Sequence, residues 1–152
     1  MNKTKLQVKE IFDVIVNCNQ SDINIVKRNH VLAGKSLSEC IDRTVLDLMS
    51  NNIDVYSVTK NDSFIGYFGE DTFKDEKWLT GFFIMPGYRT KDDKAEFWNM
   101  ITEHFNNNFK TAVLNKNKPA SKFLKQNGCV MINADVCNDG IAEIYSFVKE
   151  GA

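Results

Sequence analysis

The 152-residue chain lacks the features that mark membrane-spanning, secreted and nucleic-acid-binding proteins. No run of apolar residues approaches the roughly 18 that a membrane span needs, and the N-terminus MNKTKLQVKEIF has no apolar core of a signal peptide. The 19 lysines and arginines are interspersed with 20 aspartates and glutamates, so the sequence has no basic block for binding a phosphate backbone. We therefore expect a cytoplasmic protein with no membrane partner, and nucleic acid is disfavoured as a ligand.

Cysteine and histidine are also scarce, with four and two residues. The cysteines lie far apart and form no C-x-x-C pair: Cys18, Cys40, Cys129 and Cys137. A zinc site would need an unusual arrangement, so we expect no metal and four reduced, mostly buried thiols. A chain of this length with 43% hydrophobic residues can bury a core without disulfides, and we expect one domain over residues 1–152.

The chain is organised around a strand, a loop and a helix near its centre. The apolar run from Trp78 to Met85 is long enough for one buried strand and too short for a helix. From about Asp93 the apolar residues recur at three- and four-residue spacing, which predicts a helix. The loop between them, PGYRTKDDK, carries three cations and opens onto a helix N-terminus, where free N–H groups favour an anion. This pattern predicts a site for a phosphate-bearing ligand.

The N-terminal third is harder to interpret. Leu6 to Val16 fits a strand and a helix about equally well, and we favour a first strand over residues 6–11. Ser21 is placed to cap a short helix that Gly34 ends. The capping-box spacing of Ser36 to Glu39 then predicts a second helix of about four turns.

The rest of the chain alternates strands and helices. In chain order we expect an antiparallel hairpin at 53–59 and 64–68, a charged connection at 70–77, the central strand and helix, a strand at 111–114, a helix from Pro119 to Gly128, and strands at 129–136 and 141–149. Two strands joined through a helix should lie parallel, connected by a right-handed crossover.

Two local motifs carry a resemblance to a known family. The sequence IMPGYR at 84–89 resembles the V-x-P-x-Y-R strand end of the GNAT (Gcn5-related N-acetyltransferase) superfamily, and NKPASKFLKQNGC at 117–129 is similar to its N-x-x-A-x-x-x-Y-x-x-x-G-F helix. The resemblance covers about residues 53–149 and implies an α/β (α+β) fold with a mixed sheet of six to seven strands, a splayed parallel pair and about four flanking helices. The combination also resembles divergent GNAT-like proteins encoded by bacteriophages.

The resemblance implies transfer of an acetyl group from acetyl-CoA to a primary amine on a small molecule or a protein. The strand end would pair with the pantetheine arm, and the loop and helix start would bind the pyrophosphate. It implies these cofactor-binding residues: Ile84, Met85, Arg89, Thr90, Lys91, Asp92, Asp93, Lys94, Asn117 and Ser121. For the catalytic base, Asp75, Glu76 and Glu70 are candidates because they precede the central strand. Asn117 is alternatively a helix cap.

The sequence departs from the family pattern at three positions. Asp92 and Lys94 replace the two glycines of the phosphate loop, and a carboxylate repels a phosphate by roughly 4 kcal/mol at contact with an effective dielectric of about 20. Alternatively, Asp92 and Asp93 cap the helix. Leu124 stands where many members have a tyrosine that protonates the leaving thiolate, and Cys129 could act as a nucleophile only with a lowered pKa.

These departures keep a second hypothesis open. In it, the chain is an inactive GNAT-fold scaffold that serves as a phage virion component or a host-interaction protein, with a virion or host protein as its partner. The sequence assigns no acceptor and no oligomeric state.

Overall fold

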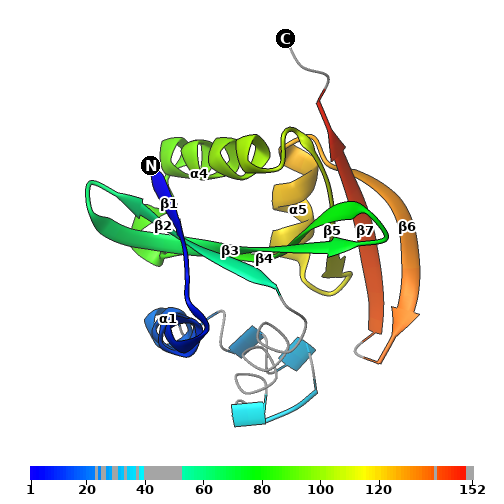
Figure 1. Ribbon diagram of the computed structural model, residues 1–152. Coiled ribbons are helices and arrows are strands. Elements are labelled where there is room, and N and C mark those ends of the chain that lie inside the picture. Colours follow the sequence, from blue (N-terminus) through cyan, green and yellow to red (C-terminus); the bar gives the residue numbers. More distant parts are fainter. Residues whose placement is uncertain are drawn as a thin grey trace.

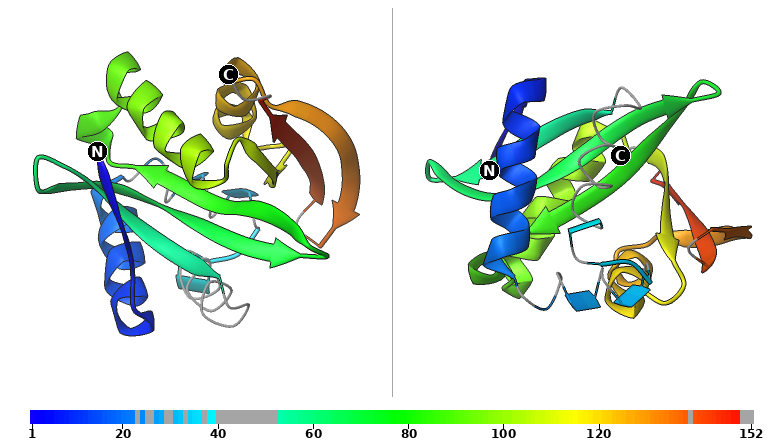
Figure 2. Two further views of the ribbon diagram at one scale, coloured as in Figure 1. Left: turned by 45° about the horizontal axis from the view of Figure 1, so that its top comes forward. Right: turned by 90° about the horizontal axis from the view of Figure 1, so that it is seen from below.

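The computed structural model describes residues 1–22, 24, 27, 28, 31, 32, 34–36, 38, 39, 53–138 and 140–149. Within these residues, seven strands form one mixed sheet in the order β1-β2-β3-β4-β5-β7-β6. Helix α1 lies on one face of the sheet, and α4 and α5 lie on the other (Figures 1 and 2). The elements are β1 (Asn2–Lys5), α1 (Val8–Ser21), β2 (Asp54–Lys60), β3 (Ser63–Phe73), β4 (Glu76–Ile84), the 3-10 turn η1 (Pro86–Tyr88), α4 (Lys91–His104), β5 (Asn108–Leu114), α5 (Lys118–Gln126), β6 (Val130–Cys137) and β7 (Gly140–Val148). The expected α/β fold with a mixed sheet of six to seven strands is confirmed.

The first strand was expected at residues 6–11, but that segment begins helix α1. The buried residues Ile11, Ile15 and Cys18 recur at helical spacing and form the inner face of the helix. The Gln7 backbone N–H donates to Glu10 Oε1 at 2.9 Å, which satisfies one of the free donors at the helix start. The first strand is instead the polar segment β1, which pairs with β2.

We expected Ser21 to cap a following helix, but the structure places it in α1 instead. It is the last residue of α1, and its hydroxyl donates to the Cys18 carbonyl at 2.7 Å. The Asn24 N–H is instead bonded to Asp22 Oδ1. Ser36 Oγ accepts the Glu39 N–H at 3.3 Å, as the capping-box spacing predicts, and most of the two helices expected in this region lies outside the described residues.

Strands β2, β3 and β4 form an antiparallel meander. The predicted hairpin at 53–68 is confirmed and is longer than expected. The segment at 70–77 is not a connection, because Glu70 to Phe73 pair with Glu76 to Leu79 across a two-residue turn at Lys74 and Asp75. Both turn residues have positive φ (51° and 62°), as a tight hairpin turn requires.

A bulge in β4 separates the strand from its parallel neighbour. Phe68 pairs with Phe82 while Glu70 pairs with Leu79, so two residues of β4, Thr80 and Gly81, face the single residue Gly69. Gly81 has a φ of 85°, which the absence of a side chain permits.

On the N-terminal side of the bulge, β4 pairs with β5 at only two positions, Trp78 with Lys110 and Leu79 with Thr111. The Thr111 hydroxyl donates to the Leu79 carbonyl at 2.8 Å where the pairing ends. This pairing confirms the expected parallel strands, and its short extent confirms their divergence.

The last hairpin returns into the sheet. Strand β7 pairs antiparallel with both β5 and β6, so β6 rather than β7 forms the edge of the sheet. The main core lies between the sheet and α4 and α5 and is rich in aromatic rings, including Phe68, Phe97, Trp98, Phe109 and Tyr145.

Candidate active site

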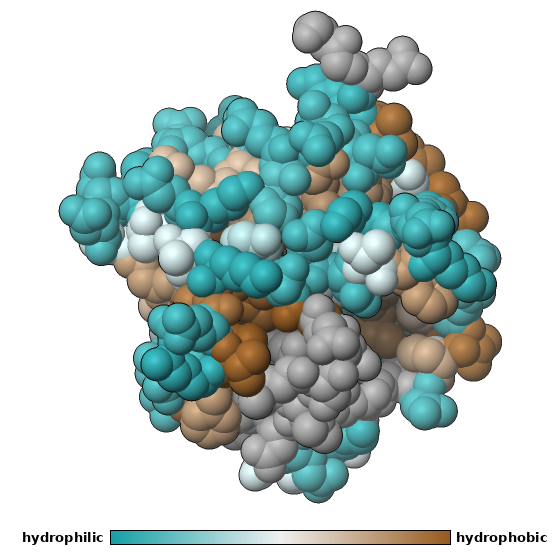
Figure 3. Space-filling model, viewed as in Figure 1, coloured by the Kyte–Doolittle hydropathy of each residue, from teal (hydrophilic) through white to brown (hydrophobic). Residues whose placement is uncertain are grey.

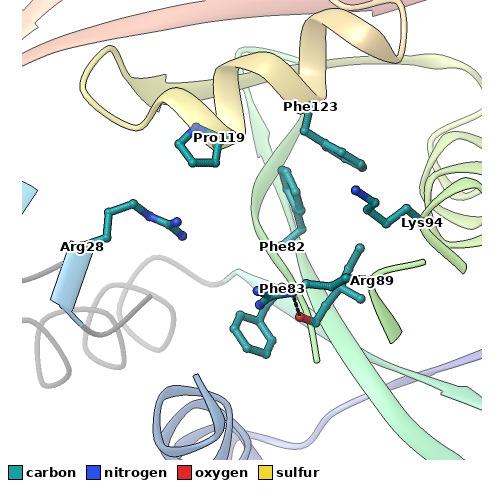
Figure 4. Close-up of a pocket in the computed structure, with 9 residues that line it drawn as sticks. Arg28, Phe82, Phe83, Arg89, Lys94, Pro119 and Phe123 are labelled. Atoms are coloured by element: carbon teal, nitrogen blue, oxygen red, sulfur yellow. Dashed lines mark hydrogen bonds between the residues drawn. The ribbon is translucent and has the colours of Figure 1, made fainter. Parts of the chain in front are cut away.

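A hollow opens beside the half of β4 that diverges from β5. Its volume is about 210 Å³, and it is lined by Arg28, Phe82, Phe83, Ile84, Arg89, Lys94, Pro119, Ala120 and Phe123. Figure 4 shows that these residues come from the end of β4 and from the starts of α4 and α5, and that Arg28 faces them across the hollow. The described lining contains three cations and no carboxylate, and the rest of its surface is largely apolar. Such a surface suits an anion that carries an apolar arm.

The strand end presents one backbone edge to this hollow. The Met85 N–H donates to Ile65 of β3 at 2.7 Å, so Met85 points its amide away from the hollow. Because backbone groups alternate along a strand, the N–H and C=O of Ile84 point the other way. The Ile84 carbonyl accepts a hydrogen bond from Arg89 Nε at 2.8 Å. The predicted contact at Ile84 is therefore occupied within the chain by Arg89.

Arg89 folds back over the strand rather than projecting from the loop. Its Nη2 lies 2.7 Å from Asp22 Oδ2, and the Asp22 side chain is 7% exposed. Its guanidinium also lies over the Phe83 ring, 5.4 Å from the centroid. Arg89 thus joins the segment after α1 to the end of β4, and Asp22 balances part of its charge.

Helix α4 begins at Lys91, and Thr90 is its N-cap. The Thr90 hydroxyl accepts the Asp93 N–H at 3.1 Å, so Thr90 and not an aspartate caps the helix. Asp92 and Asp93 do lie in the first turn, where the alternative interpretation expected their charge to favour the positive end of the helix. Lys60 Nζ of β2 donates to Asp93 Oδ1 at 2.7 Å, and this hydrogen bond lowers the pKa of Asp93. Its charge is therefore largely neutralised within the protein. Lys94 is the residue of this turn that lines the hollow.

Helix α5 presents a different face to the hollow from the one expected. Asn117 caps the helix by accepting the Ala120 N–H, which supports the cap interpretation. Ser121, a predicted cofactor contact, is 5% exposed and donates to Glu143 of β7 at 2.8 Å, away from the hollow. Leu124 is fully buried in the core. Phe123 faces the hollow instead, with its ring centroid 5.4 Å from that of Phe82.

The predicted bases lie at the far end of β4. Asp75 is in the turn between β3 and β4, and Glu76 forms an ion pair with Lys110. At about 3.3 Å per residue, the length of β4 separates them from the hollow by roughly 25 Å. Glu70 is bonded to His104 and Lys77 on the α4 face of the sheet. The structure brings none of these carboxylates to the hollow.

Cys129 is 6% exposed, and burial raises the pKa of its thiol to about 12. A buried thiol of this kind is protonated at neutral pH, so Cys129 is a core residue and not a nucleophile.

Six lining residues were missed by the sequence interpretation: Arg28, Phe82, Phe83, Pro119, Ala120 and Phe123. Phe82 could have been found from strand alternation and Phe123 from the helical face, because Phe82 stands two residues before one quoted motif and Phe123 lies within the other. Arg28 carries no such signal, since it lies far from both motifs in the sequence. Its guanidinium points across the hollow in Figure 4, and its buried Nε has no partner among the described residues.

Two further properties bear on the class of protein. None of the described helices is long and apolar enough to cross a membrane. Within the described ranges, no three side chains of the metal-ligating types gather into a group that could hold an ion.

Comparisons with known proteins agree with this geometry. A family model described as the acetyltransferase (GNAT) domain matches residues 8–134. No curated protein sequence matches the chain. A GNAT-family acetyltransferase from Streptococcus agalactiae superposes with a TM-score of 0.73 at 14% identity, covering 99% of this chain and 96% of that one.

Two further solved structures contain ligands. The acetyltransferase AAC(6')-Ib, in complex with ribostamycin and coenzyme A, has a TM-score of 0.70 at 12% identity, covering 97% of this chain and 93% of its own. The microcin C7 self-immunity acetyltransferase MccE, in complex with acetyl-CoA and AMP, has a TM-score of 0.61 at 15% identity, covering 97% and 92%. At these identities the likeness concerns the fold alone. Because the family model spans most of the chain and the sheet agrees with it, this protein belongs to the GNAT acetyltransferase family.

Proposed function

We propose that this protein transfers an acetyl group from acetyl-CoA to a primary amine on a small molecule or a protein. The observation that carries the proposal is the cationic, largely apolar hollow beside the diverging end of β4. The acetyl-CoA and coenzyme A bound to two structural neighbours support the choice of donor.

The lining residues fit such a donor in charge and in polarity. Arg28 and Lys94 are cations that face the hollow, and Arg28 Nε is a buried donor without a partner in the described chain. They would hold phosphate groups at the start of α4, where the N-terminal N–H groups and the helix dipole add to the attraction. Phe82 and Phe123 would exclude water beside the apolar arm.

When bound, acetyl-CoA supplies a thioester whose carbonyl carbon the amine nitrogen attacks, forming the amide C–N bond and breaking the C–S bond. The described lining offers no carboxylate as a base, and Leu124 cannot donate a proton to the leaving thiolate. We therefore assign the contribution of this chain to binding, orientation and exclusion of water. The amine would be deprotonated before attack, and the thiolate would take its proton from water.

The nature of the lining also favours a second candidate function, which is binding of an acyl-CoA without transfer. A buried Leu124 and the absence of a described lining acid or base are what a binding module would have. The predicted resemblance to phage proteins, with a virion or host protein as partner, stays a prediction.

Thermal unfolding with acetyl-CoA tests the proposal, followed by an assay of coenzyme A release. A ligand present at 100 times its Kd adds roughly 2.7 kcal/mol to the free energy of unfolding, which raises Tm by several degrees. Lys94→Gln should weaken acetyl-CoA binding about tenfold because it removes one cation from the hollow. Lys122→Gln is the matched control, since Lys122 lies on α5 outside the lining.

The outcomes separate the candidates. A shift in Tm, with coenzyme A released in the presence of one of a panel of primary amines, supports transfer. A shift without release from any amine supports binding alone. No shift at millimolar acetyl-CoA would remove both functions.

A further inference from the structure

Arg89 is held at the end of β4 by contacts from different parts of the chain. Its Nε donates to the Ile84 carbonyl at 2.8 Å, which Figure 4 shows as a dashed line, and its Nη2 lies 2.7 Å from Asp22 Oδ2. Its Cζ also lies 5.4 Å from the centroid of the Phe83 ring. A planar guanidinium that meets a carbonyl, a carboxylate and an aromatic face together is fixed in one orientation.

The carboxylate of Asp22 is held as firmly as the guanidinium of Arg89. Asp22 is the C-cap of α1, and its side chain is 7% exposed. Its Oδ1 accepts the Asn24 N–H at 3.0 Å, so its two oxygens bond different groups. Asp22 therefore gives Arg89 an anchor that does not turn away.

The end of α1 is itself anchored on the sheet. Ile11 and Ile15 of the helix pack against Val55 of β2, and Figure 3 shows apolar side chains gathered where α1 meets the sheet. The Ser21 hydroxyl lies 3.6 Å from the Met85 sulfur. Two consecutive residues at the end of α1, Ser21 and Asp22, thus contact the segment that follows β4.

Asp22 is poorly placed to stabilise its own helix. The C-terminal end of a helix carries partial negative charge, so a cation is preferred there and a carboxylate is repelled. The last turn of α1 has no basic residue to offset this repulsion. Arg89 supplies a cation, so the contact with Arg89 accounts for a placement that helix formation does not.

We propose that Asp22 and Arg89 form a latch that acetyl-CoA must open, so that Asp22 sets how tightly this chain binds acetyl-CoA. This inference rests on the proposed function. Arg89 lines the hollow and bonds the Ile84 carbonyl, which an amide N–H of the apolar arm would use in pairing with the strand. The ion pair with Asp22 also lowers the attraction of Arg89 for a phosphate. Asp22 is thus a positioning residue that acts through Arg89.

The latch has a predictable effect on affinity. A ligand that binds only after the latch opens has its affinity reduced by the fraction of molecules in which the latch is open. A charge-assisted hydrogen bond to a buried carboxylate favours the closed arrangement, so this fraction is small. Once Arg89 is released, its guanidinium can join Arg28 and Lys94 in attracting phosphate groups. Loss of the Asp22 charge should therefore tighten binding, whereas damage to the fold would weaken it.

Isothermal titration of acetyl-CoA into Asp22→Asn tests the latch. Asparagine keeps the size of the side chain and an acceptor for the Asn24 N–H, and we expect Kd to fall about tenfold. Asp13→Asn, on the exposed side of α1, is the matched control and should leave Kd unchanged. Arg89→Gln completes a double-mutant cycle, because Asp22→Asn should have no effect on Kd once the guanidinium is absent.

The outcomes distinguish the latch from the proposed function. Unchanged or weaker binding in Asp22→Asn, with a wild type that binds acetyl-CoA, would overturn the latch and leave the proposed function standing. An equal gain with and without Arg89 would also overturn the latch, because Asp22 would then act by its charge alone. Binding by Asp22→Asn but not by the wild type supports the latch, and no binding by either protein removes both proposals.

If Asp22→Asn fails to fold, nuclear magnetic resonance of the wild type decides the question. The Nε–H signal of Arg89, assigned by its loss in Arg89→Lys, reports on the hydrogen bond to the Ile84 carbonyl. We expect its rate of exchange with water to change at least about tenfold on saturation with acetyl-CoA, because that hydrogen bond breaks. An exchange rate that stays the same at saturation would show that Arg89 remains in place and would overturn the proposal.

Discussion

The charges in the first turn of α4 differ in how far the protein itself neutralises them. Asp93 is 15% exposed and paired with Lys60, so its carboxylate has a cation in contact. Asp92 is exposed and stands where the family pattern has glycine. Of the two aspartates, Asp92 is therefore the one whose charge would act most strongly on a phosphate group at the helix start.

Asp92→Asn should tighten acetyl-CoA binding if the pyrophosphate lies at the start of α4. Because the carboxylate is solvated, we expect a modest change, about two- to fivefold in Kd at low salt, that shrinks as salt screens it. Isothermal titration at two salt concentrations measures this change. Glu103→Gln, at the other end of the same helix, is the control and should leave Kd unchanged. Unchanged or weaker binding in Asp92→Asn would place the phosphates elsewhere.

At the scale of elements, the shape of the hollow depends on the bulge in β4. The extra residue in β4 turns the strand away from β5 after only two paired positions. Gly69 permits this arrangement, because a Cβ at that position would lie 2.5 Å from the Thr80 carbonyl oxygen and 2.8 Å from its hydroxyl. The bulge and the glycine opposite it therefore belong to the machinery that forms the site.

Gly69→Ala should lower the free energy of unfolding by about 1–3 kcal/mol, because the backbone of β4 must move to admit the new methyl group. Chemical denaturation measures the loss. Gly87→Ala is the matched control, since a Cβ there meets nothing within 4 Å, and it should change stability by less than about 0.5 kcal/mol. Equal stability in both variants would contradict the tight contact between β3 and β4.

The elements with strong local signals were predicted, and those with competing signals were not. The run from Trp78, the N–x–x–A helix and the last alternating segments gave β4, α5 and the β6–β7 hairpin close to their observed bounds, whereas β3 extends to Phe73, beyond its predicted end at residue 68. The prediction for residues 6–16 was wrong because their apolar residues fit the strand period and the helix period equally well. Burial of Ile11 and Ile15 against Val55 favours the helix. The prediction for Glu70 to Lys77 was wrong because their charge was taken as a sign of a loop, whereas Lys77 and Glu70 form an ion pair between β4 and β3.

The candidate site was predicted only as far as its local motifs reach. The end of β4 and the start of α4 were identified, because both lie within one short stretch of sequence. Arg28 and the partner of Arg89, Asp22, lie about 60 residues away along the chain, and no local pattern links them to the loop. Ser121 was assigned to the cofactor from the resemblance of the second motif, yet its place on α5, one residue after Ala120, turns its side chain to Glu143.

At the scale of the whole molecule, three ionised carboxylates hold different elements together. Glu70 of β3 bonds His104 of α4, Asp93 of α4 bonds Lys60 of β2, and Glu143 of β7 accepts from α5. Burial raises the pKa of Glu70, but hydrogen bonds from His104 and Lys77 outweigh it and leave the pKa below its usual value. Hydrogen bonds from Lys60 to Asp93, and from Ser121 and Tyr145 to Glu143, lower those pKa values as well.

A carboxyl group with a lowered pKa in the folded state stabilises the protein above its unfolded pKa and loses this effect as the pH falls through the folded pKa. We therefore expect stability to be nearly flat between about pH 6 and 8 and to fall steadily below about pH 4, where ordinary carboxyl groups take up protons. Urea denaturation across that range measures it. A stability that rises on acidification would contradict the assignment of these three carboxylates.

Glu70 gives the sharpest single test, because its side chain is 13% exposed and bonded to two partners, His104 at 3.0 Å and Lys77 at 3.2 Å. Glu70→Gln keeps the shape but removes the charge, and should lower the free energy of unfolding by about 1–2 kcal/mol at pH 7. Between pH 7 and about pH 3 the difference between the two proteins should shrink, because the wild-type carboxyl takes up protons as the pH falls towards its lowered pKa. Asp71→Asn, next to Glu70 on the same strand, is the control. A loss of equal size at both pH values would mean that Glu70 acts through packing and not through its charge.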